Sequence, residues 1–144
     1  LLLSMRDNRN RKLKGDDNGR AVGQTKNLGK TWSKHSADHG ALPEPVCMAS
    51  LISHKHPHGK HLLFFSNPHN KHHRRDITIQ MSTDDGSSWP KNHHILLDQG
   101  GGYGYSSLVM IDDKTLGILY ESSVADMTFQ IIPLSDFVKL GHSQ

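Results

Sequence analysis

The sequence has few of the residues that stabilise very small domains or membrane-spanning chains. It contains one cysteine, Cys47, so no internal disulfide can form and the redox compartment is left open. Hydrophobic residues make up 34% and aromatic residues 6%. No apolar run approaches the roughly 20 residues of a transmembrane helix. A disulfide scaffold and a membrane span are therefore excluded, and 144 residues suffice for one domain with a core.

A large excess of one charge is also missing. The net charge is +3 with neutral histidines. The basic residues lie beside Asp and Gly rather than among aromatic residues, so a nucleic-acid partner is not predicted. A charge excess of this size is typical of a solvated surface with one site for an anionic ligand.

The first residues do not have the pattern of a signal peptide. A short apolar stretch at Leu1 is followed by charge, whereas a signal peptide begins with positive charge. The chain also starts without Met, so we expect a fragment or a processed product.

Helical periodicity is absent, and short strand patterns take its place. Ile77, Ile79 and Met81 alternate with polar residues, which is the period of a strand with one buried face. Clusters of Gly, Asn, Asp and Pro separate such runs. Strands are expected at 1–6, 20–25, 48–54, 61–66, 77–82, 94–98, 106–111, 115–121 and 127–134. This spacing is typical of an all-β sandwich or propeller.

One eight-residue pattern occurs twice, as TKNLGKTW (25–32) and STDDGSSW (82–89). Its Asn or Asp side chain can bond backbone N–H groups further along and close a turn. Its Gly can adopt a positive φ, and its Trp can cover the turn. The pattern predicts two hairpin turns, and its repetition predicts repeated sheet units.

These octapeptides resemble Asp-boxes, which recur in sialidases and other propeller proteins. Four further segments resemble exo-α-sialidases of the bacterial and lysosomal type, in the same order: LLFFSNP, RRDITIQMSTDDGSSW, GYSSL and ILYESS. LSMRDNRN is similar to the segment that carries their second arginine. The resemblance implies an all-β fold, a partial six-bladed β-propeller. Residues 1–144 would form about the last two and a half to three blades, the C-terminal portion of the catalytic domain.

The resemblance also implies a function and a site. The family hydrolyses terminal sialic acids from glycoproteins, glycolipids and oligosaccharides, without a cofactor or metal, in secreted, periplasmic or lysosomal enzymes. Arg6 and Arg74 match two of the arginines that bind the sugar carboxylate, with Arg75 one residue from the second. Tyr105 matches the nucleophile. The first arginine, the Asp acid/base and the Glu that activates the Tyr belong upstream of Leu1, so this piece alone is expected to be inactive.

The order of strands and turns predicts convergence of these residues without the family. Strand 77–82 runs into the second octapeptide and the next strand runs away from it, so the loops with Arg74 and Tyr105 share the opposite end. The same reasoning places the loop after Arg6 opposite the first octapeptide. If both octapeptides lie on one face, all three residues lie on the other.

The residue types fit the chemistry. Arg presents a planar fork that binds a carboxylate through two hydrogen bonds. Sialidases use Tyr rather than a carboxylate as nucleophile. A carboxylate there would face the carboxylate of the sugar, and like charges at 4 Å repel by about 4 kcal/mol at an effective dielectric near 20. The expected path is a tyrosyl–sialyl intermediate with retained configuration.

Each of the residues singled out also has a simpler, non-functional explanation. A lone Arg near a strand end is usually a solvated charge, and a Tyr in a Gly-rich turn is usually a packing residue. Glu44 is expected to order its loop, although it could contact the glycerol or N-acetyl arm of the sugar, and Glu121 is expected to be structural. The histidines from His54 to His73 are expected to form polar hairpin ends rather than a metal site. The alternative function is a non-catalytic, glycan-binding propeller.

Overall fold

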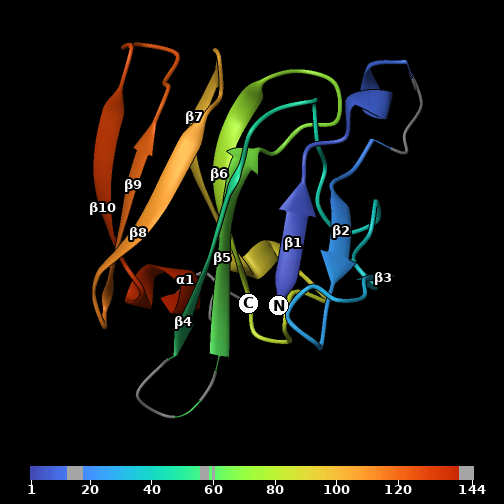
Figure 1. Ribbon diagram of the computed structural model, residues 1–144. Helices are drawn as coiled ribbons and strands as arrows, with labels where there is room; N and C mark the ends of the chain where they lie inside the picture. Colours follow the sequence, from blue (N-terminus) through green and yellow to red (C-terminus); the bar gives the residue numbers. More distant parts are fainter. Residues whose placement is uncertain (13–17, 56–58, 60, 140–144) are drawn as a thin grey trace.

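The computed structural model describes residues 1–12, 18–55, 59 and 61–139, which form three antiparallel sheets side by side (Figure 1). The first sheet contains β1 (Leu2–Met5), β2 (Ala21–Gln24) and β3 (Ser33–Lys34). The second, middle sheet contains β4 (Ser50–Lys55), β5 (His61–Pro68), β6 (Arg75–Ser82) and β7 (His94–Gly101). The third contains β8 (Ser106–Asp112), β9 (Thr115–Tyr120) and β10 (Thr128–Pro133).

The nine expected strands are all present, with ends that differ by a few residues. The two-residue strand β3 was not predicted because it is too short to show alternation. The expectation that no segment is helical was wrong at Ser135–Lys139, which forms α1. Five residues are too few for a helical repeat, and tertiary contact stabilises this helix instead. Its Phe137 is fully buried, with its ring centre 5.3 Å from that of Phe64.

Two single-turn 3-10 helices complete the described elements, η1 (Asn8–Arg11) after β1 and η2 (Lys91–His93) before β7. None of the described helices has the length and apolarity needed to cross a bilayer.

The middle sheet is buried on both faces. Phe64 and Phe65 are neighbours on β5, so their side chains point to opposite faces, and both are fully buried. Phe64 packs in a core shared with β8, β9 and α1. Phe65 packs against Trp89, with ring centres 5.9 Å apart, in a smaller core on the other side. Because apolar layers lie on both sides of β5, the three sheets are held in one order.

The strand pairing gives the sheets two functional ends. β6 runs into the second octapeptide and pairs antiparallel with β7, and β2 runs into the first octapeptide and pairs antiparallel with β1. Thr25 and Asp85, one from each octapeptide, line the same groove, so both lie at one end, the turn end. We call the other end the loop end; it consists of residues 6–12, 18–20, 43–49, 69–74 and 102–105. The predicted convergence of loops at one end is confirmed.

Both octapeptides form the expected turn. In the second, the Asp84 carboxylate accepts hydrogen bonds from the Ser88 N–H at 2.9 Å and from the Ser82 and Ser88 hydroxyls at 2.7 Å each. The Ser82 hydroxyl oxygen accepts one from the Gly86 N–H at 3.0 Å. In the first, Asn27 Oδ1 accepts a bond from the Thr31 N–H at 2.9 Å. The turns therefore satisfy their own polar groups and serve the scaffold.

Replacing Gly86 by Ala should destabilise the protein more than replacing Gly29 by Ala. Both glycines have positive φ, 83° and 89°, which costs an alanine about 1–2 kcal/mol. A Cβ at Gly86 would also lie 3.1 Å from Leu2 and 3.2 Å from Leu63, whereas at Gly29 its nearest neighbour is Trp32 at 3.7 Å. Urea denaturation of the two variants measures the difference. Equal losses of unfolding free energy would show that crowding at Gly86 is unimportant.

Candidate active site at the loop end

Arg74 and Tyr105 are in direct contact. The guanidinium carbon of Arg74 lies 5.6 Å from the centre of the Tyr105 ring, in cation–π geometry. The guanidinium also donates hydrogen bonds to two main-chain carbonyls, through Nη1 to Tyr103 at 3.0 Å and through Nη2 to Val46 at 2.9 Å. These bonds fix the plane of the guanidinium beside the phenol. Tyr105 is 41% exposed, so a ligand can reach its ring.

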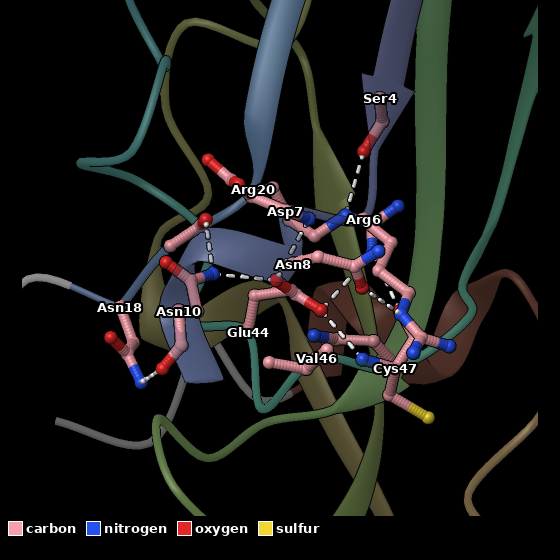
Figure 2. Close-up of polar contacts among 12 residues, drawn as sticks. Ser4, Arg6, Asp7, Asn8, Asn10, Asn18, Arg20, Glu44, Val46 and Cys47 are labelled. Carbon is pink, nitrogen blue, oxygen red and sulfur yellow. Dashed lines mark hydrogen bonds and ion pairs between the residues drawn. The ribbon is translucent and has the colours of Figure 1, made fainter. Parts of the chain in front are cut away.

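Arg6 lies on the same side of the molecule. It follows β1, and its Nε donates to Asn8 Oδ1 at 3.1 Å (Figure 2). Burial raises the pKa of the Cys47 thiol, while the positive charges of Arg74 and Arg6 oppose this rise. Hydrogen bonds join the two segments. Asp7, the residue after Arg6, and Cys47, the residue after the Val46 that Arg74 bonds, both donate their main-chain N–H groups to Glu44. The structure brings Arg6, Arg74 and Tyr105 to one end, as the strand order predicts.

The side chain of Arg75 has a different partner from that of Arg74. It is the first residue of β6, its side chain is 51% exposed, and its Nε lies 3.1 Å from Asp76 Oδ2. Arg74 instead contacts Tyr105. Of the two neighbouring arginines, the geometry therefore favours Arg74 as the ligand-binding one.

The main chain of Tyr105 is fixed from two sides. Its N–H donates to Glu121 Oε2 at 2.8 Å, and its carbonyl accepts from the Glu121 N–H at 3.0 Å. The Cys47 thiol lies 3.4 Å from the carbonyl oxygens of Tyr103 and Gly104. Gly104 has φ 81°, and a Cβ there would lie 2.7 Å from Pro68, so only glycine fits before the tyrosine. Glu121, for which the sequence predicts a structural role, bonds the main chain of Tyr105 itself.

The segment after Arg6 is held by a compact ion cluster. The Asp7 carboxylate accepts hydrogen bonds from the Arg9 side chain and from His39, and these bonds hold its pKa well below the usual range. Burial lowers the pKa of His39, but the hydrogen bonds to Asp7 and Asp38 outweigh it, so the pKa is raised overall. His39 therefore links the segment that carries Arg6 to the neighbouring loop.

A cavity of about 640 Å³ opens beside Arg74. Its lining includes the cations Arg11, Lys71 and Arg74, together with the buried amides Asn10 and Asn18. A cavity lined by several positive charges attracts anionic ligands. Tyr105 does not line it, so the cavity extends away from the phenol rather than surrounding it.

Comparisons with known proteins identify the family of the chain. The sequence profile described as "BNR repeat-like domain" matches residues 1–119. The chain belongs to the BNR repeat-like family. A sialidase of Bacteroides fragilis (strain YCH46) is 53% identical to this BNR repeat-like chain over 142 residues, which are 96% of the chain and 25% of the relative. A sialidase of Micromonospora viridifaciens is 39% identical over 85 residues, 56% of the chain and 13% of the relative.

Solved structures give the same result. The microbial sialidase Hz136 (Hadza) superposes with a TM-score of 0.82 at 51% identity, covering 93% of the BNR repeat-like chain and 25% of the other. The leech intramolecular trans-sialidase has a TM-score of 0.65 at 21% identity, with 85% and 21% coverage, and shares the fold. The chain thus spans about a quarter of the length of the Bacteroides sialidase and of Hz136.

Sequence reasoning missed several residues of the loop end of this BNR repeat-like chain. Arg20 and Cys47 are buried. Arg20 bonds Ser4, in the strand before Arg6, and the Cys47 thiol contacts the carbonyls of Tyr103 and Gly104, just before Tyr105. Arg20 lies at the start of an expected strand, and its neighbours in the sequence do not distinguish it from an ordinary strand residue. Cys47 is the one cysteine of the sequence, so no disulfide pattern draws attention to it. The two prolines that flank Glu44 were the only local signal that its loop has a fixed conformation.

The histidines of the BNR repeat-like chain are spread over several elements. Among the described residues, no three His, Cys, Asp or Glu side chains are grouped so as to hold a metal ion. His56 and His58 lie outside the described residues. His69 and His94 form a pair, with ring centres 4.9 Å apart at a steep angle. His94 Nε2 lies 2.9 Å from the Trp89 carbonyl oxygen, next to the second octapeptide.

The His69–His94 pair should make stability fall as pH falls from about 6.5 to about 4. Burial, followed by the charge of His94, lowers the pKa of His69 from 6.5 to about 4. In this window the unfolded chain binds a proton that the folded chain does not, so protons favour unfolding. Denaturant midpoints measured across the window should have a smaller slope for His69→Gln than for the parent. His61→Gln, which changes an exposed histidine, is the control, and equal slopes for parent and His69→Gln would contradict the assignment.

Proposed function

We propose that the protein containing this chain is an exo-α-sialidase that hydrolyses terminal sialic acids of glycoconjugates. Its catalytic domain would be a six-bladed β-propeller, of which this chain forms about the last two and a half to three blades. One observation carries the proposal: in a chain 53% identical to a sialidase, Arg74 lies against the ring of Tyr105 at the loop end, and Glu44 joins the segment of Arg6 to the loop that Arg74 bonds.

In this proposal Arg6 and Arg74 bind the carboxylate of the sugar. A guanidinium has five N–H donors. Arg74 uses two hydrogen bonds to hold its own plane against main-chain carbonyls, so further donors remain for a ligand. Each charge-assisted hydrogen bond to the carboxylate contributes about 1.5–3 kcal/mol. The pair therefore selects an anionic sugar over a neutral one.

Tyr105 is the proposed nucleophile. The phenol oxygen attacks the anomeric carbon as the bond to the leaving glycan breaks, which gives a tyrosyl–sialyl intermediate. Water then attacks the same carbon and releases sialic acid, with overall retention. The neutral phenol avoids the repulsion that a carboxylate nucleophile would meet from the sugar carboxylate bound by Arg6 and Arg74. The acid/base, the base for the phenol and the first of the three carboxylate-binding arginines are proposed to lie outside this chain.

Hydrolysis of a fluorogenic α-sialoside tests the proposal. The full-length protein should release sialic acid first as the α-anomer, which proton NMR identifies before mutarotation. The 144-residue chain alone should give little or no turnover, because it lacks the proposed acid/base. Near-normal turnover by the chain alone, or the β-anomer as first product, would contradict the mechanism. Binding of sialosides without turnover by the full-length protein would favour the glycan-binding alternative.

A further inference from the structure

Glu44 is a fully buried carboxylate that receives three hydrogen bonds from two different segments of the loop end. Its Oε2 accepts from the Asp7 N–H at 3.2 Å and from Asn10 Nδ2 at 2.6 Å, and its Oε1 accepts from the Cys47 N–H at 2.6 Å (Figure 2). Burying a carboxylate is costly unless it is paired and hydrogen-bonded. Glu44 meets both conditions, through these three bonds and through the nearby Arg20 guanidinium.

The two main-chain N–H groups that donate to Glu44 belong to residues close to the two arginines. Asp7 directly follows Arg6. Cys47 directly follows Val46, whose carbonyl oxygen accepts the hydrogen bond from Arg74. One carboxylate thus holds the main chain next to Arg6 and the main chain that the Arg74 guanidinium bonds, although the two arginines lie 68 positions apart in the sequence (74 minus 6).

The bond to Cys47 also holds a strained conformation. Val46 has φ 58°, a left-handed conformation that a β-branched residue rarely adopts. Such conformations persist only where surrounding contacts hold them. Here the carbonyl of Val46 is held by Arg74 and the following N–H by Glu44. The strain directs the Val46 carbonyl toward Arg74, and Glu44 maintains it.

Arg20 anchors this carboxylate to the sheets. Its Nη1 lies 3.7 Å from Glu44 Oε1 and donates to the Cys47 carbonyl at 2.8 Å. Its Nε donates to Ser4 Oγ at 3.1 Å, and its guanidinium lies 5.6 Å from the centre of the buried Phe65 ring. The counter-ion of Glu44 is therefore attached to β1 and to the smaller core. Movements of the loops relative to the sheets would have to break these bonds.

We propose that Glu44 is a positioning residue for carboxylate recognition: it sets the placement of Arg6 relative to Arg74. The inference rests on the proposed function, since it assigns the two arginines to the carboxylate of one sugar. Misplacement of a binding group by about 1 Å can cost about 10²-fold in rate. Loss of Glu44 should therefore weaken the binding of the carboxylate specifically, not the binding of the sugar in general.

The test compares two ligands that differ only in this charge. They are the unsaturated sialic acid analogue (2-deoxy-2,3-didehydro-sialic acid) and its methyl ester, titrated calorimetrically into the full-length protein. The parent should bind the acid at least about tenfold more tightly than the ester. In Glu44→Gln, the side-chain NH2 group replaces one carboxylate oxygen. It faces an N–H donor from which it cannot accept a hydrogen bond. The acid should bind about 10- to 100-fold more weakly than to the parent, with the ester nearly unchanged.

A double variant and a control complete the design. Glu44→Gln with Arg20→Gln removes both buried charges, so no unpaired ion is left to unfold the chain, and it should lose the same preference for the acid. Asp84→Asn is the matched control because it neutralises a carboxylate that also accepts hydrogen bonds from a turn, but at the turn end. The first octapeptide has Asn27 at this position, and the control should keep the parent's preference.

The outcomes separate the inference from the proposed function. If the parent does not prefer the acid, the proposed function fails. If the parent prefers the acid and folded Glu44→Gln or the double variant keeps that preference, the positioning role is overturned. If neither variant accumulates as folded protein, Glu44 is a stability residue and the role is likewise overturned. Equal weakening of acid and ester would indicate a general structural role and would also overturn it.

Discussion

Tyr105→Phe in the full-length protein should lower turnover of a fluorogenic sialoside by about 10³-fold or more. The substitution keeps the ring, and with it the packing against Arg74, but removes the oxygen that would form the covalent bond. The free energy of unfolding should change by no more than about 0.5–1.5 kcal/mol, the net value of one hydrogen bond. Steady-state kinetics and denaturant unfolding measure the two effects separately.

Tyr103→Phe provides the matched control for this result. Tyr103 lies two residues away and is 77% exposed, and only its main-chain carbonyl contacts Arg74, so its hydroxyl should be dispensable. A fluorinated sialic acid that traps the intermediate should label the peptide with Tyr105, as detected by mass spectrometry. A label on another residue, or most of the activity kept in Tyr105→Phe, would refute the assignment.

Arg74→Lys should lower kcat/KM by about 10²-fold or more. Lysine keeps the positive charge but cannot reproduce the planar fork. It would lose the paired bonds to the carbonyls of Tyr103 and Val46 as well as the two-point contact to a carboxylate. Two charge-assisted bonds contribute about 1.5–3 kcal/mol each, so even partial loss accounts for the factor. The contact both binds the sugar and orients its anomeric carbon toward Tyr105, so KM should rise and kcat should fall.

Arg75→Lys serves as the control for the neighbouring position. Arg75 is exposed and its partner is Asp76, and a lysine can still form that surface pair. Surface changes of this kind usually alter stability by less than about 0.5 kcal/mol. If Arg75→Lys loses activity and Arg74→Lys keeps it, the two arginines have been assigned the wrong way round.

Local sequence patterns predict most of the strands and both octapeptide turns. Alternation placed the strands, because side chains on a strand point to opposite faces in a period of two. The octapeptides predicted their own turns, because their hydrogen bonds join residues at most four positions apart, such as Asp84 and Ser88. Phe64 and Phe65 are adjacent on β5, so their side chains point to opposite faces, but only the packing of the sheets buries both faces.

The order of the strands also predicts which loops lie at the same end of the sheets, and therefore where the site residues meet. An antiparallel pair reverses direction at each turn, so loops that follow alternate turns share an end. This sufficed to place Arg6, Arg74 and Tyr105 at the loop end, where the structure has them. It did not distinguish Arg74 from Arg75, because adjacent residues differ only in the direction of their side chains.

The sequence by itself determined nine of the ten described strands, the two turns and, given that both octapeptides lie on one face, the end at which the three site residues meet. These features depend on contacts between near neighbours and on alternation. Only the tertiary structure decided what holds the site in place. Glu44 bonds residues 37 and 34 positions away, and Cys47 contacts a carbonyl 56 positions away. Sequence periodicity cannot predict such contacts, because they depend on how the three sheets pack around Phe65 and on the pairing of the buried Glu44 with Arg20.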